Sequence, residues 1–251
     1  MTELVLRHDA GGLATLTLNR PDKLNALNVD VFRILDEHCD ALARQTETIG
    51  LVVLRGAGRC FSAGHDLRDI GAGKESREHV AYEAQVVEKL ANLPQPVVTA
   101  VHGHCYTGAL ELALAGDVIV ASESARFADT HAKWALTPVW GLSQRLPRRI
   151  GRTRAHTLMM TCETITGREA LAIGLADRCF ADEAFEAELQ AFADTVLANS
   201  WHSLRANKAL LNETDGLPLS AGLAHEVYRS RGRGPDMQER VSAFTSKRSK
   251  T

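Results

Sequence analysis

The chain has 251 residues, of which 45% are hydrophobic and 24% are charged. These proportions are typical of a globular protein with a sizeable core, folded as one large domain or as one domain with a smaller appendage. The formal net charge of -2 offers no basic field to a nucleic-acid backbone or an anionic membrane. The charge therefore argues against nucleic acid as a main partner.

Neither export nor membrane insertion is indicated by the sequence. The N-terminal segment carries Glu3, Arg7 and Asp9 and no long apolar run, so we do not expect a signal peptide. No stretch approaches the roughly 18 apolar residues of a membrane span. Five cysteines are scattered without CxxC spacing, which favours free thiols in a reducing compartment. We expect a cytoplasmic protein with no membrane partner.

The first 180 residues or so repeat a unit in which a strand runs into a glycine-rich loop and then into a helix. Alternating or continuous apolar residues predict the strands, and apolar residues at helical spacing predict the helices, with Asn28 as a candidate N-cap. In chain order the predicted elements are strands 4–8 and 13–19, helix 29–43, strand 49–54, helix 77–93, strand 96–101, helix 107–115 with Thr107 as a candidate cap, and strand 118–121.

After about Asp182 the pattern changes to helices alone. The predicted helices of this part are 184–199, 203–211, 219–231 and 236–247. We therefore predict an α/β body over residues 1–182 and an all-helical C-terminal region over residues 183–251.

Two loops of small residues each follow an apolar strand: Cys60-Phe61-Ser62-Ala63-Gly64-His65 and Gly103-His104-Cys105-Tyr106-Thr107-Gly108. Small residues let a ligand approach the backbone, and a main-chain N–H where a helix begins is a preset donor to developing negative charge. Two such N–H groups at one point would form an oxyanion hole, although a tight turn between packed elements would have the same composition. Neither loop has the spacing of a dinucleotide fingerprint or a Walker loop.

Six motifs are spread over the chain in a fixed order: TLNRPDKLNALN, VVLRGAGRCFSAGHDL, PQPVVTAVHGHCYTGALELALAGDVIVASESARFAD, SQRLPRRIG, ITGREALAIGLADRCF and SAFTSKR. Together they resemble the enoyl-CoA hydratase/isomerase (crotonase) family. The resemblance implies a superhelix of ββα units and a helical C-terminal region that mediates homotrimers, often paired into hexamers. It also implies that the main-chain N–H groups of His65 and Gly108 hold the thioester oxygen of an acyl-CoA and stabilise an enolate.

Hydratases of this family use two glutamates to orient a water and move a proton. The first matches Glu111, which interrupts an apolar run and is costly to bury unless it is functional or internally hydrogen-bonded. The second falls on His131, the main departure from the family pattern. A histidine can replace the missing acid or base, or it can simply line the pocket. Asp129 is a candidate partner of His131.

The resemblance also assigns residues to coenzyme A. A lysine beside a phosphate acts as a point charge, although taken singly each lysine here reads as a solvated surface charge. The matching residues are Lys23 and Leu24 on the pantetheine and phosphate side, Ala63, Asp66 and Leu67 where the adenine approaches the backbone, and Phe244 and Lys247, a pair often supplied by a neighbouring subunit.

We therefore predict an enoyl-CoA hydratase of fatty acid metabolism that uses Glu111, with His131 as a helper. Because the second carboxylate is missing, the alternative is decarboxylation of a malonyl-type acyl-CoA, or isomerase or hydrolase chemistry; some decarboxylases share FSAGHD. A non-catalytic acyl-CoA-binding protein is the third reading. We expect no cofactor beyond the coenzyme A of the substrate, and no metal, since His102 and His104 lack a third ligand.

Overall fold

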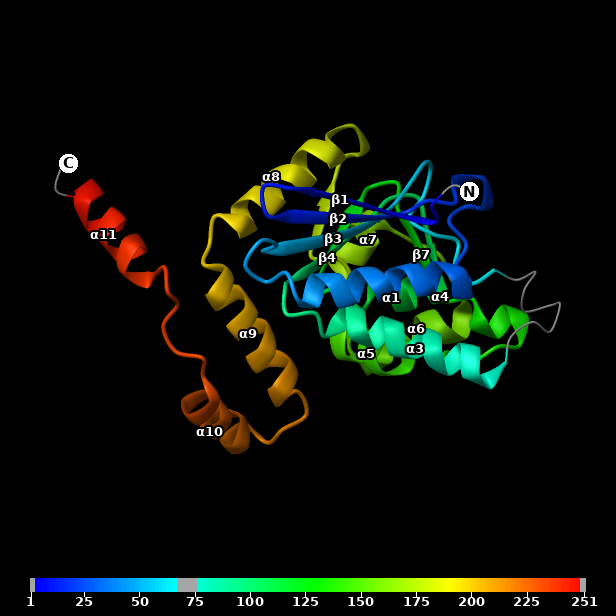
Figure 1. Cartoon of the computed structure of the whole chain (residues 1–251). Coiled ribbons are helices and arrows are strands. Elements are labelled where there is room, and N and C mark those ends of the chain that lie inside the picture. Colours follow the sequence, from blue (N-terminus) through cyan, green and yellow to red (C-terminus); the bar gives the residue numbers. More distant parts are fainter. Residues whose placement is uncertain (1–2, 67–75, 249–251) are drawn as a thin grey trace.

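The computed structural model of the chain describes residues 3–66 and 76–248. Its body is a six-stranded sheet in the order β1-β2-β3-β4-β6-β9 (Figure 1). Strands β1 and β2 form an antiparallel hairpin, and the remaining neighbours pair in parallel. The strands are β1 (Val5–Ala10), β2 (Leu13–Leu18), β3 (Leu51–Gly56), β4 (Val97–Val101), β6 (Val118–Ser122) and β9 (Arg178–Phe180).

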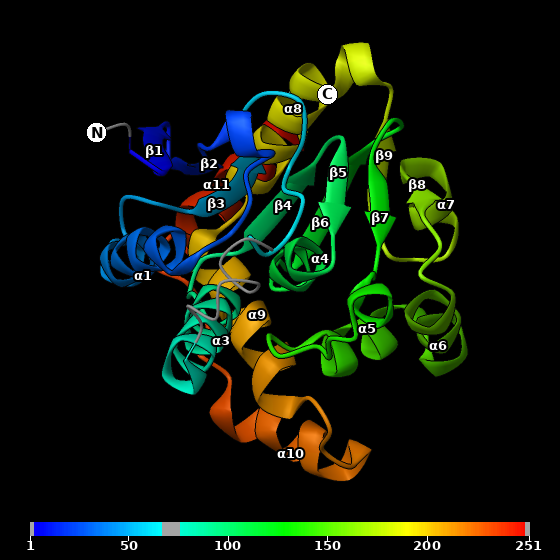
Figure 2. The same ribbon diagram turned by 90° about the vertical axis from the view of Figure 1, so that its right-hand side faces the viewer.

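A second, three-stranded sheet is made of β5 (His104–Tyr106), β7 (Arg126–Ala128) and β8 (Ile165–Thr166), in the order β5-β7-β8. Figure 2 shows β5 and β7 side by side next to the main sheet. Strand β5 follows β4 after a turn at Gly103, whose φ is +56°. The chain thus leaves the main sheet at Gly103, the first residue of the second glycine-rich loop.

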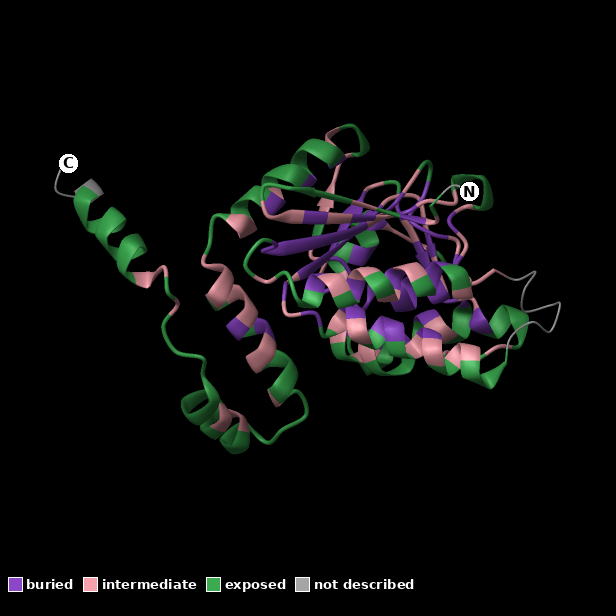
Figure 3. Ribbon diagram, viewed as in Figure 1, coloured by how far each residue is buried: buried purple, intermediate pink, exposed green. Residues whose placement is uncertain are grey.

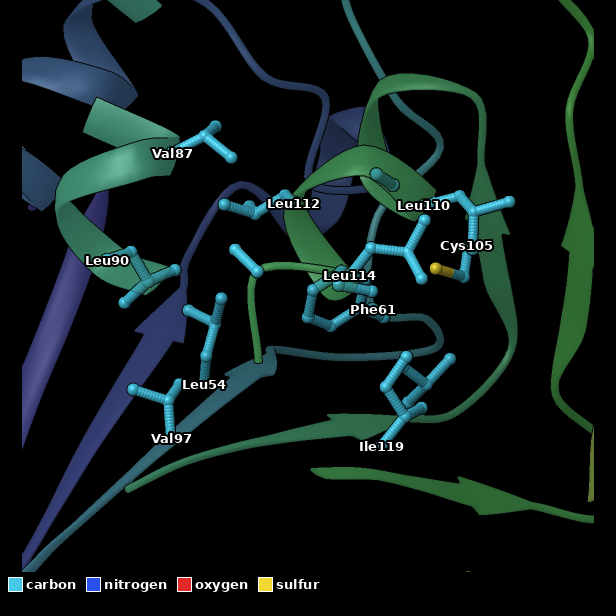
Figure 4. Close-up of a cluster of buried hydrophobic side chains, with 14 of the residues drawn as sticks. Leu54, Phe61, Val87, Leu90, Val97, Cys105, Leu110, Leu112, Leu114 and Ile119 are labelled. Carbon is cyan, nitrogen blue, oxygen red and sulfur yellow. The ribbon is translucent and has the colours of Figure 1, made fainter. Parts of the chain in front are cut away.

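Alternate residues of the strands point to opposite sides of the main sheet, so both of its faces carry apolar side chains. Helices cover both faces. Val52 and Leu54 face the helices α1 (Val29–Ala43) and α3 (Arg77–Ala91), which pack against each other. Figure 4 shows this side of the core, where Leu54, Val97 and Leu90 lie near the side chains of α4 (Gly108–Ala113). On the other side, Leu51 and Val53 pack against α8 (Phe185–Leu197).

The C-terminal helices leave the body. Helix α9 (Trp201–Thr214) runs alongside it, whereas α10 (Leu219–Arg229) and α11 (Met237–Arg248) stand apart and are largely exposed (Figures 1 and 3). The predicted division at residue 182 remains a prediction. Within the described ranges, no helix combines the length and the apolar character that crossing a membrane requires.

Every strand and helix predicted from the sequence is present within a few residues of its expected bounds, and the α/β class is confirmed. Asn28 caps α1 as predicted, since its side chain accepts from the N–H of Val31. Thr107 occupies the N-cap position of α4 as predicted, but its side chain makes no capping hydrogen bond to the helix. Among the described residues, the strands and α-helices that were not predicted are β5, β7, β8, β9, α5 (Leu142–Ile150), α6 (Arg152–Thr161) and α7 (Gly167–Ala172).

Candidate active site

The two glycine-rich loops run side by side. The N–H of Ser62 donates to the carbonyl of His104 at 2.9 Å, and the N–H of Tyr106 donates back to the carbonyl of Ser62 at 3.4 Å. Gly64 has a φ of +98°, and a Cβ on it would lie 2.5 Å from the Tyr106 oxygen and 3.5 Å from the Gly108 nitrogen. Only glycine fits this close approach. The structure therefore brings His65 and Gly108 to the same place.

Helix α4 begins at Gly108, so the N–H of this residue has no acceptor within its own helix. The preceding Thr107 has φ 53° and ψ -108°, a conformation that branched residues rarely adopt. Two contacts hold it there. Its N–H donates to the carbonyl of Ala128 at 2.9 Å, and its hydroxyl lies 2.5 Å from that of Thr130. These bonds fix the peptide that carries the Gly108 N–H.

A cavity of about 290 Å³ opens beside these loops. Its walls are largely apolar and aromatic, as expected of a site for a small organic group. Gly108 lies against the ring of Trp140, where a Cβ would meet the indole at 2.5 Å. The lining residues are Ala63, His65, Val80, Thr107, Gly108, Glu111, Thr130, His131, Trp134, Ala135, Leu136, Thr137, Val139 and Trp140.

Glu111 lies at this cavity and is only 1% exposed. Its Oε1 accepts hydrogen bonds from the main-chain N–H groups of Trp140, at 2.8 Å, and Leu142, at 3.1 Å. Burial raises the pKa of Glu111, and the two hydrogen bonds and the nearby His131 oppose that rise. The site thus holds a carboxyl group whose raised pKa suits proton transfer.

His131 begins the short 3-10 helix η2 (His131–Trp134) and is 7% exposed. Its Nε2 lies 3.7 Å from Oε2 of Glu111, and its Nδ1 lies 2.6 Å from Oδ1 of Asp129. The structure therefore brings together three titratable side chains that the sequence had marked: Glu111, His131 and Asp129. Their chemical roles remain predictions.

Part of the predicted coenzyme A site lies next to the first loop. The N–H of Ala63 donates to the carbonyl of Leu24 at 2.9 Å, which ties the turn after η1 (Pro21–Lys23) to the cavity wall. Lys23, the last residue of η1, is exposed. Asp66 forms an ion pair with Arg20 at 3.2 Å.

Phe244, one member of the predicted C-terminal pair, does not line the cavity within one chain. Phe244 is 62% exposed on α11, which stands apart from the body (Figure 1). The side chain of Lys247 and the whole of Leu67 lie outside the described residues. Their assignment to coenzyme A stays a prediction.

Sequence reasoning missed the partners that hold Glu111 in place. The N–H donors of Trp140 and Leu142 follow Glu111 by about thirty residues, and main-chain donors leave no mark in a sequence. Thr130 was also missed, because its hydroxyl contacts that of Thr107 only in the folded chain and belongs to no sequence motif.

The pair His102 and His104 is bonded within the chain. Nε2 of His102 lies 2.9 Å from the carbonyl of Gly58, and Nδ1 of His104 lies 3.0 Å from the hydroxyl of Tyr106. In the part of the chain that the structure describes, no group of three or more His, Cys, Asp or Glu side chains is arranged to hold a metal ion.

The family model for enoyl-CoA hydratase/isomerase matches residues 8–251. The chain belongs to this family. It is 35% identical to a 1,2-epoxyphenylacetyl-CoA isomerase of Escherichia coli, over 99% of this chain and 98% of that protein, and 32% identical to a probable enoyl-CoA hydratase of Rhizobium meliloti, over 98% and 96%. An enoyl-CoA hydratase structure from Bacillus anthracis superposes with a TM-score of 0.92 at 29% identity, covering 98% of this chain and 97% of that one. The predicted family and its fold are thereby confirmed.

Proposed function

We propose that this member of the enoyl-CoA hydratase/isomerase family is an enoyl-CoA hydratase, which adds water across the double bond of a 2-enoyl-CoA. The observation that carries the proposal is the position of Glu111. Its buried carboxyl group lines the same cavity as His65 and Gly108, the residues at which the two glycine-rich loops meet. The coenzyme A part of the substrate would lie along the turn at Leu24 and the wall at Ala63.

The two main-chain N–H groups of His65 and Gly108 would bind the thioester oxygen. Negative charge gathers on this oxygen when water attacks the β-carbon, and one aligned donor contributes about 3 kcal/mol to the transition state. The same polarisation makes the β-carbon electrophilic. Because Gly108 opens a helix and is held by the bonded Thr107, its donor is set before the substrate arrives.

Glu111 and His131 would move the protons. The oxygen of water bonds to the β-carbon while its proton passes to one member of the pair, and the other member donates a proton to the α-carbon. Transfer between Oε2 and Nε2, which lie 3.7 Å apart, restores the starting state. Hydration involves no change of oxidation state overall, so we propose that coenzyme A of the substrate is the only non-protein group needed.

The test is loss of absorbance of crotonyl-CoA at its conjugated thioester band. We expect turnover by the wild type and near-complete loss in Glu111→Gln, with Glu188→Gln, an exposed side chain of α8, as the matched control. Carbon dioxide release from methylmalonyl-CoA without hydration would instead identify a decarboxylase. Binding of acyl-CoA with no turnover of any thioester would identify a binding protein.

A second candidate function is isomerisation of 1,2-epoxyphenylacetyl-CoA. It is favoured by the 35% identity to the E. coli isomerase, which extends over nearly the whole of both chains. Incubation with that epoxide, read by mass spectrometry and chromatography against the crotonyl-CoA assay, separates the two activities.

We also propose that the protein is a homotrimer, alone or as a dimer of trimers, that it acts in the cytoplasm and that it serves fatty acid metabolism. Support for the oligomer comes from apolar side chains left exposed on α10 and α11, among them Leu219 at 80%, Val227 at 72% and Phe244 at 62%. Exposed apolar surface of this extent favours burial against another copy. Analytical ultracentrifugation gives the mass; a monomer at micromolar concentration would refute the oligomer.

A further inference from the structure

One carboxylate holds both the main chain and the ring of His131. Oδ1 of Asp129 lies 2.6 Å from Nδ1 of His131 and accepts the main-chain N–H of the same residue at 3.2 Å. Both side chains are buried, with Asp129 1% exposed. A carboxylate only accepts hydrogen bonds, so a neutral imidazole in this position carries its proton on Nδ1.

The other ring nitrogen of His131, Nε2, lies on the side of Glu111. Nε2 lies 3.7 Å from Oε2 of Glu111, and both residues line the cavity. In the imidazolium form both nitrogens carry a proton and the bond from Nδ1 to Asp129 is kept. Gain and loss of a proton by His131 therefore take place at Nε2 alone, on the side of Glu111.

Hydrogen bonds connect the residues on both sides of Asp129 to the second glycine-rich loop. The next residue, Thr130, donates its N–H to the Thr107 hydroxyl at 3.1 Å, and the N–H of Thr107 donates to the carbonyl of Ala128 at 2.9 Å. These bonds join the segment on either side of Asp129 to the residue that precedes Gly108. The orientation of His131 is thus fixed relative to the proposed donor to the thioester oxygen.

We propose that Asp129 is a positioning residue for the proposed hydration: it holds His131 in the tautomer protonated at Nδ1 and keeps Nε2 free to exchange protons beside Glu111. In this chain a histidine oriented by an aspartate then stands where the hydratases of the family have a second glutamate. The kinetic consequence rests on the proposed function. The tautomer itself does not.

The first test needs neither turnover nor a variant of Asp129. Imidazole nitrogen-15 NMR of the wild-type protein, with the His131 signals assigned from their absence in His131→Gln, reports which nitrogen carries the proton. We expect the tautomer protonated at Nδ1. A neutral His131 protonated mainly at Nε2 would overturn the proposal, whether or not the protein hydrates crotonyl-CoA.

The second test is a double-mutant cycle. We expect Asp129→Asn to lower kcat for crotonyl-CoA by about 100-fold, the scale of a lost general acid or base, with KM little changed. In a His131→Gln background the same change should have little further effect, because Asp129 acts through His131. Asp194→Asn, an exposed side chain of α8, is the control. An unchanged kcat, or an equal loss in both backgrounds, contradicts the positioning role; if Asp129→Asn does not fold, the wild-type spectrum decides.

Discussion

Two buried charged side chains, Glu111 at the cavity and Lys208 on α9, show how one fold treats charge in different ways. Lys208 is 8% exposed, and its Nζ lies 2.8 Å from Oδ2 of Asp117 and 3.1 Å from the carbonyl of Gln95. Burial lowers the pKa of Lys208, and Asp117 opposes that shift. The Asp117 carboxylate thus balances the charge of Lys208 at close range, and the ion pair links α9 to the end of the sheet.

Glu111 has no cation at such a distance among the described residues. Its Oε1 is held by two main-chain N–H groups, and the nearest basic nitrogen that the structure records is Nε2 of His131, 3.7 Å from Oε2. Burial without a close counter-charge destabilises the ionised form of a carboxyl group. A purely structural role gives no reason to keep a glutamate in such a position. Glu111 and Lys208 are buried to a similar extent, so what distinguishes the candidate catalytic group from the structural one is the close counter-charge that only Lys208 has.

The largest expected effect is the loss of activity in Glu111→Gln. The amide can still accept from Trp140 and Leu142, but it cannot carry a proton, so kcat for crotonyl-CoA should fall by about 1000-fold. The fold should be retained. Steady-state kinetics and circular dichroism check both points, and an active Glu111→Gln protein would remove Glu111 from the mechanism.

Asp117→Asn should instead lower the stability of the fold and leave the activity unchanged. It leaves the buried Lys208 ammonium without its counter-charge, at a cost of about 2 kcal/mol in the free energy of unfolding, less than for a fully buried pair because the Asp117 side chain is 28% exposed. The cavity is untouched, so kcat should stay near the wild-type value. Urea unfolding measures the loss.

Asp30→Asn is the control for this change, because Asp30 pairs with Arg33 at the surface. We expect it to cost about 0.5 kcal/mol or less. Equal losses in the two variants would show that the pairing of Lys208 contributes nothing special.

The pH dependence of stability sharpens the contrast. The pKa of Glu111 is raised above 4.5, so the folded protein keeps a proton that the unfolded chain loses as pH rises past 4.5. The contribution of Glu111 to the wild-type free energy of unfolding therefore falls as the pH rises from 4.5 to the raised pKa. Glu111→Gln lacks that contribution, so its stability relative to wild type should increase from pH 4.5 upward. Urea unfolding across that range is the measurement; a constant difference contradicts the raised pKa.

The smallest effect is expected at the cavity mouth. Trp134 lines the cavity but is 55% exposed, so Trp134→Ala should raise KM several-fold and leave kcat nearly unchanged, since it removes packing against the substrate and no reacting group. Met160→Ala, 76% exposed on α6 and absent from the cavity wall, is the control. A fall in kcat with an unchanged KM would place Trp134 nearer the chemistry.

Much of this could be predicted because the signals are local. The spacing of apolar residues predicts α1 at its observed bounds, and Glu111 stands out as a charge within an apolar run. The missed elements are those whose local signal is weak. Strands β5 and β7 are three residues long, too short for alternation to show, and α5 contains Pro147, which argues against a helix. The main-chain donors to Glu111 depend on contacts that only the fold creates.

The measurement that tests the account most directly is a crystal structure of the Glu111→Gln protein with a 2-enoyl-CoA bound. We expect the thioester oxygen within hydrogen-bonding distance of the main-chain nitrogens of both His65 and Gly108, with the β-carbon facing residue 111 and Nε2 of His131. An acyl group bound elsewhere, or a thioester oxygen that meets neither nitrogen, would contradict the account.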